Sequence, residues 1–229
     1  MPEIEADRCL LEVIATTVDD AVAAERGGAD RIELIAGIRE GGLTPSLGLV
    51  EAACDAVRIP VRVMVRPHSR GFVYSRADLA VMLADVRHIR SRKPGGWVLG
   101  ALRSDGAVDE EALRRLLAEA DGLPVTFHRA FDESRSLEEA FDCLVGYPQV
   151  TTILTSGGQA TAIAGMTRLA SLVARAEARK RRLPIMAGAG LGESGLEAFL
   201  LRSGVRHVHI GSAARRDGNP LMPVVAERV

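Results

Sequence analysis

Short apolar runs and amphipathic segments alternate along the whole chain. The runs are rich in Val, Ile and Leu, as expected for strands that are buried on both faces. From Glu12 in the first run to His209 in the last, the seven steps average about 28 residues, enough for a strand, a helix and two loops. The eight runs read CLLEVIA, DRIELIAG, VRVMVRP, WVLGAL, LPVTFHR, VTTILTSGG, LPIMAGAG and VRHVHIGSA.

The segments between these runs have the spacing of helices that bury one face. Within residues 77–89, for example, Leu79, Met82, Leu83 and Val86 lie on one side of a helix. The same analysis predicts helices at 18–26, 47–57, 110–120 and 196–201. Eight strand and helix units without a polar linker predict a single (β/α)₈ TIM-like barrel domain spanning residues 1–229.

Composition removes several classes of partner. The 29 basic and 30 acidic residues nearly cancel, so neither nucleic acid nor an anionic membrane surface has electrostatic support as a partner. No apolar stretch approaches the length of a membrane span, and the acidic start MPEIEADRC is unlike a secretory signal. Three widely spaced cysteines, Cys9, Cys54 and Cys143, indicate buried thiols in a reducing compartment. We therefore expect a cytoplasmic protein; the sequence leaves open whether it forms a homo-oligomer.

Polar residues follow the apolar runs at the points where the strands should end, which is where TIM barrels carry their chemistry. Because side chains alternate along a strand, Arg62 and Arg66 share one face of their strand and can point into the barrel. The candidate acid and base groups are Glu12, Glu33, His128 and Asp132, and His209 is a further candidate site residue.

Glycine-rich strand ends predict a site for a small anionic or phosphorylated metabolite, because backbone N–H groups without bulky side chains bind anions. The predicted anion-binding residues are Arg66, Arg129, Ser156, Gly157, Gly188, Gly190 and Ser212. The alternative is that Gly188 and Gly190 only form a tight turn. Gly190, Gly192 and Gly195 also match GxGxxG, but the next strand ends in Gly211 and Ser212 without an acidic residue, so NAD is not expected.

The residues favour acid and base chemistry over covalent catalysis. The two lysines, Lys93 and Lys180, lie in a loop and at a predicted helix end, which excludes a Schiff-base mechanism. A lyase or isomerase acting on a phosphorylated metabolite without a metal is the enzymatic hypothesis. The competing structural interpretation pairs Glu12 and Glu33 with Arg62 and Arg66 as buried ion pairs.

A metal site is the other alternative. His207 and His209 share one face of a strand that should adjoin Glu12 once the barrel closes, and two imidazoles could hold Zn²⁺ or Cu²⁺. A lone HxH is more often a pair of which only the outer histidine reaches the site. The residues by themselves therefore predict no metal and no certain cofactor.

Several longer blocks resemble the CutC family across about residues 9–215. They are LLEV, GGADRIEL, EGGLTPS, VTFHRAFD, LTSGG and MAGAG, in this order and at the predicted strand ends. The resemblance implies a cytoplasmic TIM-like barrel linked to copper homeostasis and copper ion binding, so copper is a cofactor by resemblance only. Among the site residues, it implies roles for Glu12, Glu33, Arg66, His128, Arg129, Asp132, Ser156, Gly157, Gly188, Gly190 and His209.

The chain departs from the family pattern where copper ligands are expected. Many family members carry cysteine just after the first two glutamate motifs, where this chain has Ile14 and Ile35. Because soft thiolates select Cu(I), their loss removes the best ligands. The stretch after Arg66 also differs, since it reads RPHSRGF where the family usually has RPRGGDF.

Overall fold

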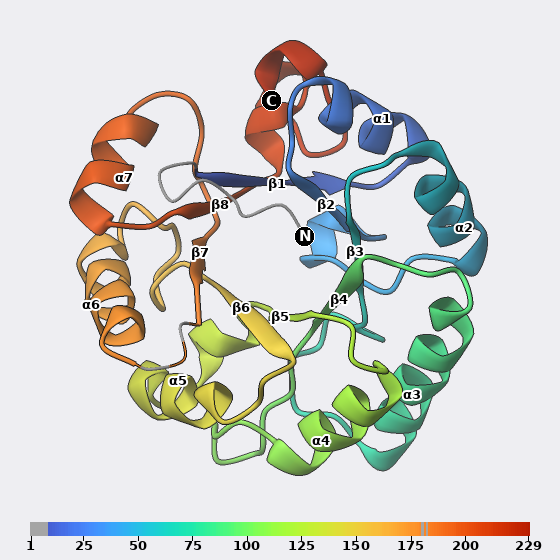
Figure 1. Ribbon diagram of the computed structural model, residues 1–229, viewed down its shortest axis with the longest axis vertical. Helices are drawn as coiled ribbons and strands as arrows, with labels where there is room; N and C mark the ends of the chain where they lie inside the picture. The colour runs from blue at the N-terminus through green and yellow to red at the C-terminus, as the bar shows by residue number, and fades with distance from the viewer. Residues whose placement is uncertain (1–8, 180, 182) are drawn as a thin grey trace.

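The chain forms a closed barrel of parallel strands surrounded by helices. The computed structural model describes residues 9–179, 181 and 183–229. Within these residues, the strands close in the order β1-β2-β3-β4-β5-β6-β7-β8, and the helices form an outer ring (Figure 1). The predicted (β/α)₈ architecture is thus confirmed.

The bounds of the elements follow the alternation in the sequence. The strands are β1 (Leu10–Ala15), β2 (Arg31–Leu34), β3 (Val61–Met64), β4 (Gly96–Leu99), β5 (Val125–Phe127), β6 (Val150–Thr155), β7 (Ile185–Ala187) and β8 (His207–Ile210). The α-helices are α1 (Val18–Arg26), α2 (Leu47–Ala56), α3 (Arg76–Arg90), α4 (Glu110–Glu119), α5 (Leu137–Val145), α6 (Met166–Glu177) and α7 (Leu196–Ser203). Short 3₁₀ turns are η1 (Ile38–Glu40), η2 (Arg129–Glu133), η3 (Ser212–Ala214), η4 (Arg216–Gly218) and η5 (Ala226–Arg228).

Side-chain caps explain why several helices begin where they do. The hydroxyl groups of Thr17 and Ser46 accept backbone N–H groups in the first turns of α1 and α2, satisfying donors that have no partner inside a helix. Ser75 and Asp78 form a reciprocal capping box at the start of α3. The helix bounds predicted from the sequence agree with the structure to within two residues.

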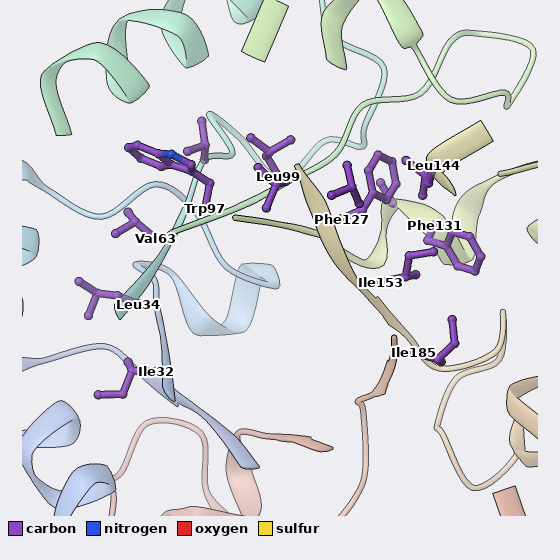
Figure 2. Packing of buried hydrophobic residues seen from close by; sticks show 14 of the residues in the cluster. Ile32, Leu34, Val63, Trp97, Leu99, Phe127, Phe131, Leu144, Ile153 and Ile185 are labelled. Carbon is purple, nitrogen blue, oxygen red and sulfur yellow. The ribbon is translucent and has the colours of Figure 1, made fainter. Parts of the chain in front are cut away.

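The main apolar core lies between the barrel wall and the helices rather than inside the barrel. Outward-facing strand residues such as Ile32, Leu34, Trp97 and Phe127 pack into one continuous cluster (Figure 2). The inward-facing positions carry a small separate cluster of Ile35, Met64 and Val98 with buried polar side chains around it. The lumen is therefore unusually polar for a barrel of this kind, which normally fills it with branched apolar residues.

The register of neighbouring strands brings the polar lumen residues to similar levels. Glu12 on β1 pairs with His209 on β8 and with Arg31 on β2. Glu33 lies two residues beyond Arg31 on β2, opposite Ile14 of β1. Residues from the two ends of the chain therefore meet at the closing seam.

The segment after β8 returns to α1 and closes against it (Figure 1). Asp20 on α1 accepts hydrogen bonds from the Val224 N–H at 2.9 Å and from the buried Arg215 guanidinium at 3.1 Å. Sequence periodicity did not reveal this attachment. Among the described residues, no helix is both long and apolar enough to cross a bilayer.

Candidate functional site

A cavity of about 420 Å³ opens at the carboxyl ends of the strands. Its wall includes Glu33, Arg66, His128, Arg129 and His209, and the volume lies in the range of small-molecule sites. Of the candidate site residues Glu12, Glu33, Arg66, His128 and His209, four line this cavity. The fifth, Glu12, does not line it and is fully buried beneath His209.

Glu12 is held by two partners. Its Oε2 lies 2.5 Å from Nε of Arg31, and its Oε1 lies 2.7 Å from Nδ1 of His209. On the other side of the ring, Nε2 of His209 lies 3.7 Å from Oε2 of Glu33. The site therefore contains a carboxylate, an imidazole and a second carboxylate in a row.

The electrostatic surroundings give the two carboxyl groups different pKa values. Burial favours the neutral acid at Glu12, but Arg31 and His209 together outweigh it and lower its pKa well below the ordinary range. Burial raises the pKa of Glu33 to about 7, with His209 opposing and Glu12 adding to the rise. Although burial acts against the charged ring, Glu33 and Glu12 raise the pKa of His209. His209 therefore lies between two carboxyl groups whose pKa values are shifted in opposite directions.

The alternative interpretation, in which Glu12 and Glu33 form buried ion pairs with Arg62 and Arg66, is wrong, because both arginines make their hydrogen bonds elsewhere. Arg62 donates to the hydroxyl groups of Thr126 and Thr151 at 3.3 and 3.4 Å. Arg66 donates to the carbonyls of Glu40 and Gly42 at 2.9 and 3.3 Å. The true partner of Glu12 is Arg31, which the sequence analysis missed although it stands two positions before Glu33 and so shares its strand face.

His128 follows β5 and is held by its backbone surroundings. The Ala130 N–H donates to Nδ1 at 3.2 Å, whereas Nε2 is buried and has no partner among the described residues. The ring packs 4.9 Å from the Phe72 ring, and a Cβ at Gly100 would lie only 2.8 Å from Nδ1. Neither Phe72 nor Gly100 carries a sequence signal that points to this contact.

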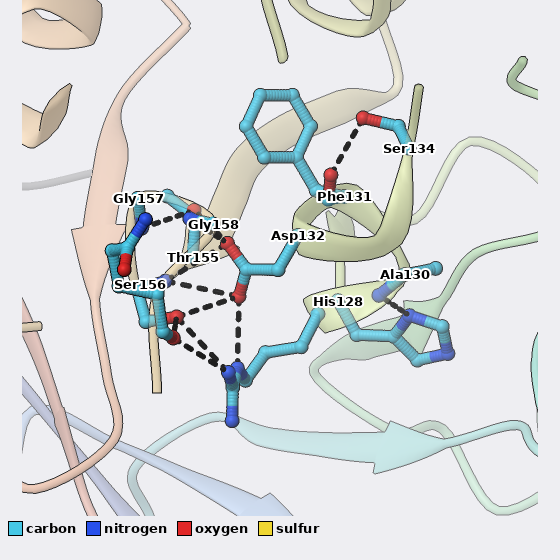
Figure 3. Close-up of polar contacts among 11 residues, drawn as sticks. His128, Ala130, Phe131, Asp132, Ser134, Thr155, Ser156, Gly157 and Gly158 are labelled. Carbon is cyan, nitrogen blue, oxygen red and sulfur yellow. Dashed lines mark hydrogen bonds and ion pairs between the residues drawn. The ribbon is translucent and has the colours of Figure 1, made fainter. Parts of the chain in front are cut away.

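Asp132 organises the turn that follows β6. Its carboxylate accepts the backbone N–H groups of Ser156 at 3.0 Å and Gly158 at 2.9 Å, together with the Thr155 hydroxyl (Figure 3). The Gly157 N–H donates to the Thr155 hydroxyl oxygen at 2.9 Å. The backbone donors of Ser156 and Gly157, predicted to bind a ligand anion, are thus already occupied inside the protein.

The same carboxylate positions Arg129. Nε of Arg129 lies 2.9 Å from Oδ2 of Asp132, and one terminal nitrogen donates to the Ser156 hydroxyl at 3.0 Å. Arg129 lines the cavity and keeps 42% of its side chain exposed. Asp132 and Ser156 therefore support the cavity through Arg129 and do not belong to its wall.

The remaining predicted anion-binding residues lie in the loops after β7 and β8, and they have different roles. Gly188 donates its N–H to the Thr155 carbonyl at 3.1 Å, and a Cβ there would lie 2.8 Å from Leu154, so Gly188 serves packing. Gly190 and Ser212 line the cavity. The N–H of Gly190 has no partner among the described residues, and the preceding Ala189 has a φ of 76°, a strained conformation for alanine.

One group of described residues has the spacing of a metal site, formed by Glu12, Glu33 and His209. His207 does not belong to it, as expected if only the outer histidine of the HxH pair reaches the site. The cysteines are free and lie outside both this group and the cavity wall. Lys93 lies in a turn after α3, and Lys180 lies outside the described residues.

Comparison with known proteins identifies the family. A model of the CutC family matches residues 9–214. The human copper homeostasis protein cutC homolog is 41% identical over 214 residues, covering 93% of this chain and 76% of that protein. A CutC family protein of Salmonella enteritidis is 41% identical over 200 residues, covering 87% of this chain and 78% of its own.

Solved structures agree with this assignment. The crystal structure described as a copper homeostasis protein CutC from Streptococcus agalactiae has a TM-score of 0.81 and 30% identity, covering 88% of this chain and 97% of that chain. Phosphoribosyl anthranilate isomerase from Thermococcus kodakaraensis shares the fold alone, with a TM-score of 0.60 and 16% identity over 93% of this chain and 94% of its own. The motifs, the barrel and these matches together show that the chain belongs to the CutC family.

Proposed function

We propose that this protein acts in copper homeostasis in the cytoplasm. The observation that carries the proposal is the 41% identity with the human protein of that name, which extends over 93% of the chain. Three free cysteines are consistent with a reducing compartment. A homo-oligomer stays compatible with this role, and we expect neither nucleic acid nor a membrane as a partner.

The residues of the cavity do not fit a resident copper ion. Both oxygens of Glu12 are engaged, one by Arg31 and one by His209, which leaves one carboxylate and one imidazole nitrogen. Two such donors are too few for a closed site, and neither is the soft ligand that Cu(I) prefers. Ile14 lines the cavity, and neighbouring Ile35 also lines it, so apolar side chains stand where many relatives have thiols. We infer that this protein influences copper without storing Cu(I) at the cavity.

Genetic complementation tests the role in copper homeostasis. Cells lacking this protein should tolerate added copper differently from cells that carry it, and the triple variant Cys9→Ser, Cys54→Ser, Cys143→Ser should complement like wild type. Titration of both purified proteins against a Cu(I) chelator should show weak and equal affinity. Tight, stoichiometric binding that is lost with the cysteines would contradict our account, and unchanged copper tolerance would overturn the proposed role.

A second candidate function is acid and base chemistry on a small anionic metabolite, independent of a metal. It is favoured by a specific observation: Oε1 of Glu33 and Nε2 of His128 are buried, belong to residues of the cavity wall and lack partners among the described residues. Thermal unfolding with a panel of sugar phosphates and carboxylates tests it, because a ligand that binds only the folded state raises the midpoint. No shift with any member at millimolar concentration would remove this candidate.

A further inference from the structure

Two buried polar atoms without hydrogen-bond partners, on residues that line the cavity, point to a ligand that would bind them. Glu33 and His128 are each 3% exposed, and both Oε1 of Glu33 and Nε2 of His128 lack hydrogen bonds among the described residues. A buried polar atom without a partner costs about 1–3 kcal/mol. Such atoms are rare in native proteins and require an explanation. A ligand that contacts both atoms supplies one.

The backbone determines which proton His128 carries. Because Nδ1 accepts the Ala130 N–H at 3.2 Å, the neutral ring must carry its proton on Nε2. Burial lowers the pKa of His128 to about 3, and the nearby charge of Arg66 acts in the same direction. At neutral pH, Nε2–H of His128 is therefore a buried hydrogen-bond donor without a partner among the described residues. The sequence predicts His128 as an acid or base that transfers a proton, whereas the structure makes it a hydrogen-bond donor that keeps its proton.

Glu33 is the complementary acceptor. Its Oε2 faces Nε2 of His209 across 3.7 Å, while Oε1 has no partner. His209 cannot rotate freely, because Nδ1 is held by Glu12 at 2.7 Å. Glu33 is thus the carboxylate of the cavity that can take a proton from a ligand, and Glu12 and His209 are positioning residues.

Arg66 adds a buried positive charge that the protein itself does not neutralise. Its guanidinium group donates to the backbone carbonyls of Glu40, Gly42 and Ser69, and it makes no ion pair among the described residues. The side chain is 6% exposed and lines the cavity. Because an unpaired charge is costly to bury, this end of the cavity favours an anionic group.

We propose that the cavity catalyses proton transfer at the carbon next to a carbonyl group in a small molecule that also carries a phosphate or carboxylate. The Glu33 carboxylate takes the proton from that carbon. The electron pair of the broken C–H bond forms a carbon–carbon double bond, and the carbonyl π pair moves onto oxygen, which accepts a hydrogen bond from Nε2–H of His128. Return of the proton to the same carbon re-forms the carbonyl group and completes the cycle without a co-reactant.

This proposal rests on the second candidate function, and proton exchange in deuterium oxide tests it separately from binding. The probes are hydroxyacetone phosphate, which carries a phosphate, and α-oxobutyrate, which carries a carboxylate. We expect proton NMR to show enzyme-dependent loss of the signal next to the carbonyl of at least one probe. Glu33→Gln should slow this exchange by about 100-fold or more, whereas Glu193→Gln, an exposed glutamate in the loop after β7, should leave it unchanged.

A second readout concerns the proton on His128. Heteronuclear NMR of isotope-labelled histidine should place it on Nε2 near neutral pH, with a change in that signal when the probe is added. A proton on Nδ1 would overturn the assigned role. If a probe raises the midpoint of thermal unfolding but exchanges no proton, the proposed proton transfer is overturned, whereas binding of the anion at the cavity is still supported. If neither probe binds, the proposal is rejected, and the second candidate function also fails for these compounds.

Discussion

The Nδ1 atom of His209 lies 2.7 Å from Oε1 of Glu12, a carboxylate with no exposure to solvent. This contact joins the first and last strands of the barrel at residues that are 197 positions apart. It also turns Nε2 of His209 toward Glu33 at the cavity wall. One buried contact thus closes the barrel and orients the candidate site.

Glu12→Gln should destabilise the fold strongly. The amide nitrogen cannot accept a hydrogen bond from Arg31 or His209, and the buried Arg31 charge would lose its carboxylate. Breaking a buried pair in this way costs about 3–5 kcal/mol. Glu138→Gln, which removes an exposed ion pair with Arg168, should cost less than about 1 kcal/mol. Urea unfolding of both variants checks this; equal costs would contradict the importance assigned to Glu12.

Glu33→Gln should have the opposite effect, and only at higher pH. The pKa of Glu33 is raised from 4.5 to about 7 in the folded protein, so the folded state holds the proton more tightly. The resulting stability is complete below about pH 4 and is lost as pH rises through 7. Glutamine avoids this loss, so the variant should be more stable than wild type by ~1–3 kcal/mol near pH 8.

The control for Glu33 is the pH dependence itself. Near pH 4 the carboxyl group is protonated in both the folded and unfolded states, so the two proteins should unfold at similar urea concentrations. A stabilisation that is equally large at both pH values would show that the effect comes from packing and not from the charge.

The fold was predictable because periodicity is a local property. The start of α1 at Val18 and its end at Arg26 follow from the Thr17 cap and from the glycines after it. The attachment of the chain end was not predictable in this way. It depends on Asp20 meeting Val224, residues that are 204 positions apart, and no periodic pattern reports such a contact.

Which residues belong to the candidate site was easier to predict from the sequence than which of them bond to each other. Their positions at predicted strand ends placed Glu33, Arg66 and His128 at the barrel mouth, and all three line the cavity. Their partners depend on register between strands, which alternation does not supply, and Arg31 was missed for this reason. The Asp132 carboxylate occupies N–H groups more than 20 residues away, a contact that composition could not reveal.

Ala189→Gly should stabilise the protein although it removes a methyl group. Ala189 adopts a φ of 76° beside the cavity, which costs an alanine ~1–2 kcal/mol relative to the right-handed region. After the greater flexibility of glycine in the unfolded chain is subtracted, we expect a gain of ~0.5–1 kcal/mol. Ala174→Gly, at an exposed position inside α6, should instead lose about 1 kcal/mol. Thermal unfolding of the pair checks this, and a loss at Ala189 would contradict the strain.

Calorimetric binding of phosphoglycolate, compared with inorganic phosphate, tests the central claim most directly. Phosphoglycolate joins a phosphate to a planar carboxylate that resembles the charged intermediate of the proposed proton transfer. We expect wild type to bind it at least about tenfold more tightly than phosphate, a difference of ~1.4 kcal/mol or more. His128→Ala should remove this advantage, and Arg66→Gln should weaken the binding of both anions. Equal affinity of wild type for both anions, or affinities that neither substitution changes, would contradict the assignment of the cavity as a site for proton transfer on small anions.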